Sequence, residues 1–268
     1  MRGWIQRAGL IALAMTMNAC GPSAPSVTTV PALPEAQAAI LGHSAVLFGH
    51  QSVGGNILDG VARVAGRCVA LTMSRNAPLR VPGIRHFYAG NNGDPLGKIA
   101  DFDAALAAAP PGSVDIAVLK FCFVDITAQT DGHALAEAYV AAYDRWRERY
   151  PQVRFVAVTA PLTAVDAWSL RSIVRRLLGR APSGFEANVR RRDFNEVLRA
   201  HFKGAELFDL SLLESTALGA ASSVELNGVR VATLDPRLTD DGGHLNTRGQ
   251  DLAAAEFLRT LAARAESR

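Results

Sequence analysis

Short apolar segments alternate with helix-like segments along most of this chain, and this alternation constrains the fold more than any other feature. Ala45–Gly49, Val114–Phe121 and Val153–Thr159 are largely apolar, as strands buried on both faces are. Helical periodicity follows such segments, for example over Leu135–Tyr150. Strands joined by helices run parallel, and the helices cover both faces of the sheet. The sequence therefore predicts a three-layer α/β/α sandwich.

The same pattern continues to the C-terminus without a linker, so the 268 residues are expected to hold one domain. A hydrophobic content of 49% excludes a mostly disordered chain, and three cysteines are too few for a disulfide scaffold. Two further strands are predicted at Cys68–Met73 and Ala205–Asp209. The remaining helices are predicted from Ser52 toward Ala65, over Lys98–Ala109, over Phe185–Phe202, and from Thr247 to about Ala263.

The N-terminus has the features of an export signal. Arg2 and Arg7 precede an apolar run that is too short to span a bilayer, so residues 1–19 are predicted to be a signal peptide. Without these two arginines the formal net charge falls from +3 to +1, which argues against nucleic acid as a partner. The Ala19-Cys20-Gly21 sequence resembles a bacterial lipobox, in which the cysteine is lipidated; ordinary secretion is the alternative.

Lipidation at Cys20 would make residues 20–34, which are rich in Pro, Ser and Thr, a flexible tether to a domain over residues 35–268. The expected location is then the bacterial cell envelope, periplasmic or at the outer membrane, with membrane contact only through the lipid. We expect the domain to be a monomer.

Two short segments carry candidate catalytic residues. Ser52 follows the first strand at the start of a helix, where its hydroxyl would lie at the edge of the sheet and its N–H could bind an oxyanion; it could equally be a helix cap. Asp241 precedes His244 by three residues, so its carboxylate can reach Nδ1 and leave Nε2 free to act as a base. A solvated turn is the alternative for this second segment.

Taken together, these segments resemble the SGNH (GDSL-type) hydrolase superfamily over roughly residues 45–258. The closing block of that family is matched by Asp241, His244, Asn246 and Gly249. The resemblance implies a flavodoxin-like parallel five-stranded sheet of order 2-1-3-4-5. It also implies a catalytic triad of Ser52, His244 and Asp241.

Three blocks depart from the family pattern. The first reads Gly49-His50-Gln51-Ser52, with no aspartate before the serine. The second supplies an oxyanion N–H from glycine, and Gly93 matches it better than Gly90. The third, Cys122–Asp125, keeps the aspartate, so Asp125 is a candidate substrate-binding residue, but it has Val124 in place of the oxyanion asparagine. Losing such a donor costs about 3 kcal/mol of transition-state stabilisation. The candidates to replace it are Asn91, Asn92, Gln51 and His50.

No metal or cofactor is expected, because the histidines lack zinc-site spacing and no phosphate-binding glycine motif is present. Cys68 and Cys122, placed on strands either side of the first, are too far apart to pair and are expected to be free, buried thiols. The arginines between Arg171 and Arg192 are expected to form a solvated helix face with partners such as Glu186 and Asp193. Alternatively, they attract anionic glycans or lipid headgroups. Trp168 is either a sugar platform or plain packing.

The sequence thus favours a serine esterase or acetylesterase that acts on a small acyl ester or an acylated glycan. Two alternatives remain. One is a non-hydrolytic domain that binds envelope polysaccharide, which the missing asparagine favours. The other is an O-acyltransferase that uses the same triad.

Overall fold

A parallel six-stranded sheet forms the centre of the computed structural model, which describes residues 33–76, 79–166, 178 and 180–267. Every pairing between neighbouring strands is parallel, in the order β2-β3-β1-β4-β5-β6. The strands are β1 (Ala45–His50), β2 (Leu71–Met73), β3 (Gly83–Tyr88), β4 (Ile116–Leu119), β5 (Arg154–Val158) and β6 (Leu207–Phe208). The predicted α/β/α fold class is confirmed, with six strands in place of five.

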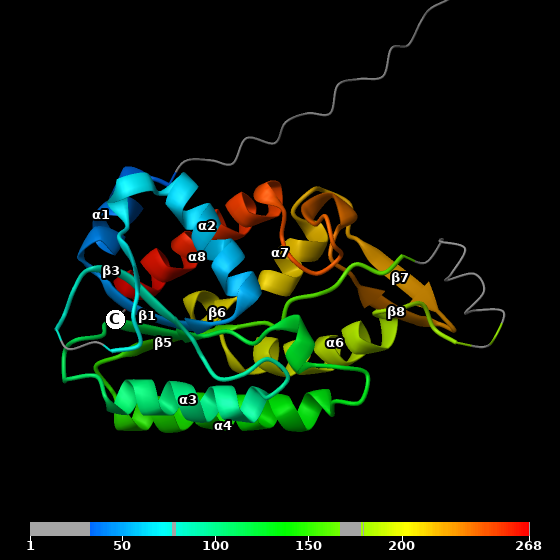
Figure 1. Ribbon diagram of the computed structural model, residues 1–268, viewed down its shortest axis with the longest axis horizontal. Coiled ribbons are helices and arrows are strands. Elements are labelled where there is room, and N and C mark those ends of the chain that lie inside the picture. Colours follow the sequence, from blue (N-terminus) through cyan, green and yellow to red (C-terminus); the bar gives the residue numbers. More distant parts are fainter. Residues whose placement is uncertain (1–32, 77–78, 167–177, 179, 268) are drawn as a thin grey trace, which may run out of the picture.

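Helices cover both faces of the sheet (Figure 1). One layer contains α1 (Glu35–His43), α2 (Ser52–Val64) and α8 (Thr247–Glu266), and α7 (Leu210–Thr216) lies against α8. The opposite layer contains α3 (Pro95–Ala107), α4 (Gly132–Arg149) and α6 (Phe185–His201). Strand β1 explains why both layers are needed, since all six of its residues are buried.

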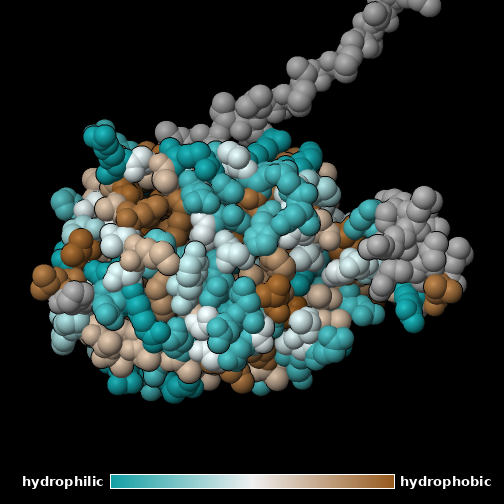
Figure 2. All heavy atoms as spheres, viewed as in Figure 1, coloured by the Kyte–Doolittle hydropathy of each residue, from teal (hydrophilic) through white to brown (hydrophobic). Residues whose placement is uncertain are grey.

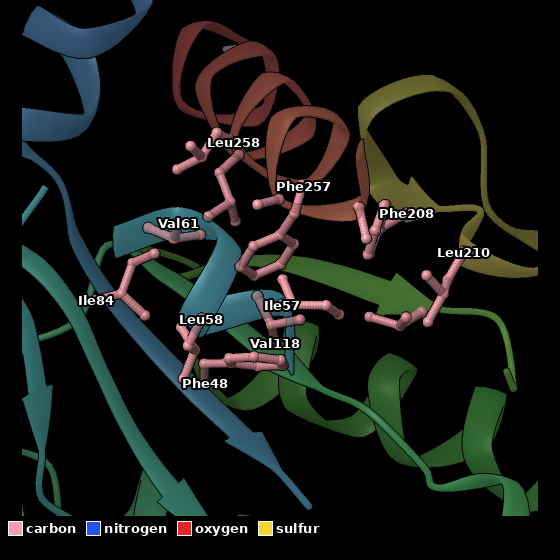
Figure 3. Close-up of a cluster of buried hydrophobic side chains, with 14 of the residues drawn as sticks. Phe48, Ile57, Leu58, Val61, Ile84, Val118, Phe208, Leu210, Phe257 and Leu258 are labelled. Atoms are coloured by element: carbon pink, nitrogen blue, oxygen red, sulfur yellow. The ribbon is translucent and has the colours of Figure 1, made fainter. Parts of the chain in front are cut away.

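Side chains of β1 alternate between two hydrophobic clusters, as the period of a strand requires. Phe48 points into the cluster beneath α2 and α8, where Ile57 and Phe257 are fully buried (Figure 3). Leu47 points the other way, into a cluster that includes Tyr139 and Trp146 of α4. Because both faces are packed, the strand ends are the places where polar groups can gather.

Strand β3 was not predicted, and it changes the order of the sheet. It pairs with β1 along its whole length, whereas the predicted second strand is reduced to the edge strand β2. Two polar residues break the apolar pattern of β3. Arg85 is buried and donates to Leu79 O at 3.2 Å, and His86 Nδ1 lies 3.1 Å from His50 Nε2. Hydrogen bonds thus satisfy the polar side chains of Arg85 and His86, which made the sequence of this segment too polar to be predicted as a buried strand.

Both described cysteines are free thiols, as expected, but only one is buried. Cys122 follows β4 and is 1% exposed. Cys68 is exposed, because it belongs to a 3-10 turn (Gly66–Cys68) and not to a strand. The prediction of burial was therefore wrong for Cys68.

A separate antiparallel hairpin, β7 (Ser223–Leu226) and β8 (Val229–Ala232), projects at the right of Figure 1. Asn227 and Gly228 form its two-residue loop with φ values of 52° and 76°. Asn-Gly suits such a turn because both central residues need positive φ. The hairpin was not predicted. It packs Val231 against Val165 and Phe185, beside the start of α6.

Candidate active site

Ser52 is the first residue of α2, directly beyond the carboxyl end of β1. The link is a single extended residue, Gln51, whose carbonyl accepts the N–H groups of Gly54 at 2.8 Å and Gly55 at 3.2 Å. A Cβ on Gly54 would overlap the His50 side chain, so glycine lets the helix begin this close to the strand. The first N–H groups of a helix have no intrahelical acceptor and favour negative charge. Ser52 thus begins a helix directly after the first strand, as predicted, and its role as a nucleophile stays a prediction.

Asp241 and His244 form a hydrogen-bonded pair. Asp241 Oδ2 lies 2.7 Å from His244 Nδ1, and Oδ1 accepts the N–H groups of His244 and Gly243, each at 2.8 Å. The His244 backbone, its side chain and then the Gly243 N–H hold the pKa of Asp241 well below its usual range. The ionised carboxylate orients the imidazole through Nδ1, which leaves Nε2 unengaged by this pair. Asn246, the next block residue, caps α8 by accepting the Gly249 N–H at 3.1 Å.

The loop that carries His244 is attached to the first turns of α2. Leu245 N–H donates to Asn56 Oδ1 at 3.2 Å, one helical turn after Ser52. The loop also packs on Phe123, whose ring is 5.3 Å from the His244 ring, edge to face. Phe123 follows Cys122, and Cys122 Sγ lies 3.5 Å from Ser52 Oγ. Ser52 and His244 thus approach the same Cys122–Phe123 segment from two sides.

Among the described residues, no hydrogen bond joins Ser52 Oγ to His244. The contact recorded for Ser52 Oγ is Cys122 Sγ. A serine side chain has three staggered positions about χ1, and only one of them is seen here. Formation of a Ser52–His244 hydrogen bond thus remains a prediction.

The two glycines predicted to supply an oxyanion N–H are engaged elsewhere. Gly93 N–H donates to Asp125 Oδ1 at 2.8 Å, and Gly90 N–H donates to Asp101 Oδ2 at 2.8 Å. Both glycines have positive φ, 85° and 54°. In this conformation their N–H groups are bound to carboxylates, so neither is an oxyanion donor.

Asp125, predicted as a substrate-binding residue, is instead buried and paired with a lysine in this structure. Its side chain and that of Lys98 are both 0% exposed, and Lys98 Nζ lies 2.8 and 2.6 Å from the two carboxylate oxygens. Asp125 Oδ2 also accepts the Cys122 N–H at 2.6 Å. We call the Lys98–Asp125 ion pair, together with the Gly93 and Cys122 N–H groups that donate to Asp125, the buried clamp. It joins the loop after β3 to the loop after β4.

The candidates to replace the missing asparagine also serve mainly as structural links. His50 is 1% exposed, and burial, only partly opposed by its hydrogen bond to Gln51, lowers its pKa to about 4. Gln51 Nε2 donates to Ala89 O and Gly90 O at 3.1 and 2.7 Å. Asn92 Oδ1 accepts from Lys98 at 3.1 Å. Asn91 is exposed near the clamp. Val124, where the family has asparagine, is 37% exposed.

An open cavity of about 570 Å³ lies beside the Asp241–His244 pair. Its wall is fixed to the histidine loop, because Ala164 N–H donates to Gly242 O at 2.8 Å. The lining residues include Phe123, Thr163, Gly184, Arg191, Asp241 and His244. This volume is in the range of small-molecule sites.

Arg191 lines the cavity, so the expectation of a solvated helix face is wrong for this residue, while the alternative of an anion-attracting role stays a prediction. It was grouped with exposed arginines, and Arg190 and Arg192 do pair with Asp193, at 3.7 and 3.0 Å. Arg191 is instead 4% exposed, on the same inward face of α6 as Asn188 and Leu198. Burial lowers its pKa to about 10, and the charge of Glu214 opposes that shift. The helical spacing of 188, 191, 195 and 198 was the available signal. Trp168 and Arg171 lie outside the described residues.

Within the described part of the chain, no group of three acidic, histidine or cysteine side chains could hold a metal ion. No described helix is long and apolar enough to cross a membrane. Hydrophilic residues dominate the face shown in Figure 2, where the hydrophobic patches are small and separate.

No family model and no curated protein matches the chain, but solved structures do. A proposed acylhydrolase of Bacteroides fragilis is 14% identical, with 87% of this chain and 90% of that chain covered and a TM-score of 0.49. A proposed lipolytic protein of the G-D-S-L family from Desulfitobacterium hafniense is 11% identical over 81% and 99% of the two chains, with a TM-score of 0.47.

A third match is the periplasmic domain of a lipopolysaccharide acetyltransferase from Salmonella Paratyphi A. It is 11% identical over 83% and 85% of the two chains, with a TM-score of 0.44. The matches thus include a protein of the family that the sequence blocks resemble. The function proposed below rests on this chain's own residues.

Proposed function

We propose that the protein is a serine esterase that removes an acyl or O-acetyl group. The observation that carries the proposal is the ionised Asp241 bound to His244 Nδ1. The loop that contains this pair is hydrogen-bonded to α2 one helical turn after Ser52. The carboxylate fixes the tautomer in which Nε2 can accept a proton, which is the requirement for activating a serine hydroxyl. The open cavity lined by His244 can hold the alcohol part of an ester.

In this mechanism Ser52 Oγ leaves Cys122, donates its proton to His244 Nε2 and attacks the ester carbonyl. The oxyanion that forms is stabilised by the N–H groups at the N-terminus of α2. His244 then protonates the leaving alcohol, and the acyl-enzyme remains on Ser52. Water, activated by His244, attacks the acyl-enzyme, releases the carboxylic acid and restores Ser52. Asp241 stays ionised throughout.

Hydrolysis of p-nitrophenyl acetate by residues 35–268 tests this proposal. Ser52→Ala and His244→Ala should each lower kcat by at least about 10³-fold. The matched controls are Ser223→Ala and His133→Ala, which change exposed residues away from the cavity and should retain activity. Stoichiometric labelling by a fluorophosphonate, lost in Ser52→Ala and retained in Ser223→Ala, would identify the nucleophile. Equal rates in all five proteins would contradict the esterase.

A non-hydrolytic glycan-binding domain is the second candidate. Two observations favour it: Gly93 N–H is bound to Asp125, and Ser52 Oγ contacts Cys122 Sγ, not His244. This candidate predicts no fluorophosphonate labelling, with oligosaccharide binding unchanged in Ser52→Ala. Acyl transfer is tested by adding a sugar to the p-nitrophenyl acetate assay. A transferase would form the acetylated sugar, because the sugar hydroxyl would accept the acetyl group in place of water.

We also propose that export and lipid attachment at Cys20 place this activity in the cell envelope. The basis is the sequence of residues 1–20, which lie outside the described residues. Mass spectrometry of the membrane-bound protein should show a lipidated N-terminal Cys20, and Cys20→Ser should release the protein from the membrane. A soluble wild-type protein with an intact N-terminus would contradict the proposal.

A further inference from the structure

The guanidinium of Arg191 lines the cavity and, in the described part of the chain, is held only by neutral hydrogen-bond acceptors. Its Nη1 donates to Thr163 Oγ1 at 3.0 Å and to Asn188 Oδ1 at 2.5 Å, and its Nη2 donates to Phe123 O at 2.7 Å. These acceptors are all neutral. No carboxylate of the described residues lies within ion-pair distance of this guanidinium, whereas Arg190 and Arg192 both reach Asp193. Nε of Arg191 is buried and has no hydrogen-bond partner.

Keeping this cation away from solvent is costly unless an anion compensates for it. Arg191 is 4% exposed, yet it lines the cavity beside His244. Glu214 acts on it only through longer-range charge, and burial raises the pKa of that carboxyl, which weakens the compensation at neutral pH. The cavity therefore contains a fixed positive charge that forms no ion pair with any described residue.

The spacing of Arg191 and His244 is set by Phe123. Arg191 holds the Phe123 carbonyl, while the Phe123 ring packs against the ring of His244. Asp241 also lines the cavity, so an anionic ligand is repelled at that side. A ligand with its ester at His244 and its anionic group toward Arg191 avoids that repulsion.

We propose that the alcohol part of the substrate carries an anionic oxygen group, a carboxylate or a phosphate, which binds at Arg191. An acetylated acidic sugar has this chemistry, since a sugar ring would separate the ester from the anionic group and could contact Phe123. The guanidinium suits both kinds of oxyanion through its charge, and one N–H of Nη2 is not used by the three bonds above. This inference rests on the proposed esterase and specifies its substrate class.

The test compares O-acetylated methyl glucuronoside with its methyl ester, which has the same ring without the charge. The wild-type domain should show a kcat/KM at least tenfold higher for the free carboxylate. Arg191→Gln should bring the two rates to within about threefold, whereas Arg190→Gln, the exposed neighbour, should retain the preference. An acetylated glucose 6-phosphate in parallel distinguishes phosphate from carboxylate.

Equal rates on acid and ester in the wild type would overturn the inference, and so would a preference that survives in Arg191→Gln. Because the wild-type comparison needs no variant, the test stands even if Arg191→Gln fails to fold. Binding of unacetylated methyl glucuronoside and its methyl ester to Ser52→Ala, measured by NMR titration, separates the two proposals. If Ser52→Ala binds the carboxylate selectively but the wild type hydrolyses neither substrate, the esterase proposal is wrong and the anion site stands. If the wild type hydrolyses both substrates equally and Ser52→Ala shows no selectivity, the esterase proposal stands and the anion site is wrong.

Discussion

The buried clamp and the Asp241–His244 pair contain the same chemistry, a carboxylate holding a cationic or titratable group, in opposite surroundings. Both side chains of the Lys98–Asp125 pair are 0% exposed, and its contacts join segments far apart in the chain. The side chains of His244 and Asp241 are 41% and 57% exposed, and their bonds span two or three residues. Burial makes the first pair important for folding. Exposure beside a cavity leaves the second accessible to a substrate.

The largest effect should come from Asp241→Asn, which keeps the shape of the exposed pair and removes its charge. The amide favours the wrong imidazole tautomer, so kcat for p-nitrophenyl acetate should fall on the order of 10³–10⁴-fold. Unfolding in urea should change by less than about 1 kcal/mol, because the side chain is mostly solvated. Asp240→Asn is the matched control and should leave kcat unchanged. A large loss of stability in Asp241→Asn would erase the contrast between the two carboxylates.

The buried clamp should show the reverse behaviour. Lys98→Met leaves Asp125 charged and unpaired, which should lower the free energy of unfolding by about 3–5 kcal/mol in urea titrations. Adding Asp125→Leu should recover part of that loss, because both charges are then gone. A cost near zero for Lys98→Met would mean that the clamp behaves like a surface pair.

Acidification should destabilise the protein through His50, the last residue of β1. The ordinary pKa of histidine is 6.5, and burial lowers that of His50 to about 4. Between these values the unfolded chain binds a proton that the folded protein does not bind. The free energy of unfolding should therefore fall by about 3 kcal/mol from pH 6.5 to pH 4. Denaturant titrations across this range should show a shallower fall in His50→Gln, while exposed His133→Gln should follow the wild type.

The smallest effect is expected at Arg192, which pairs with Asp193 near the surface. Arg192→Gln should change the free energy of unfolding by less than about 0.5 kcal/mol, since salt and water screen such pairs. The measurement is again urea unfolding, at low and high salt. A loss comparable to that of Lys98→Met would show that burial is not what separates the two kinds of pair.

The same contrast explains what the sequence could predict. The Asp241–His244 contact is local, so residue spacing alone indicated it. Gly93 and Asp125 are 32 residues apart, and nothing in either segment shows that one binds the other. Strand β3 was missed because Arg85 and His86 have partners from other elements. The apolar segments of β1, β4 and β5 were predicted to within a few residues, because their burial follows from hydrophobicity alone.

Val124 lies in the turn that the clamp supports, and its side chain can be changed without disturbing the clamp. The clamp uses the backbone and the aspartate of the Phe123–Asp125 turn, whereas the side chain at 124 is already 37% exposed and is not one of its members. An amide introduced at this position would add no unsatisfied buried group, so the fold should tolerate it. A single substitution to asparagine at position 124 should therefore leave the support beneath it intact.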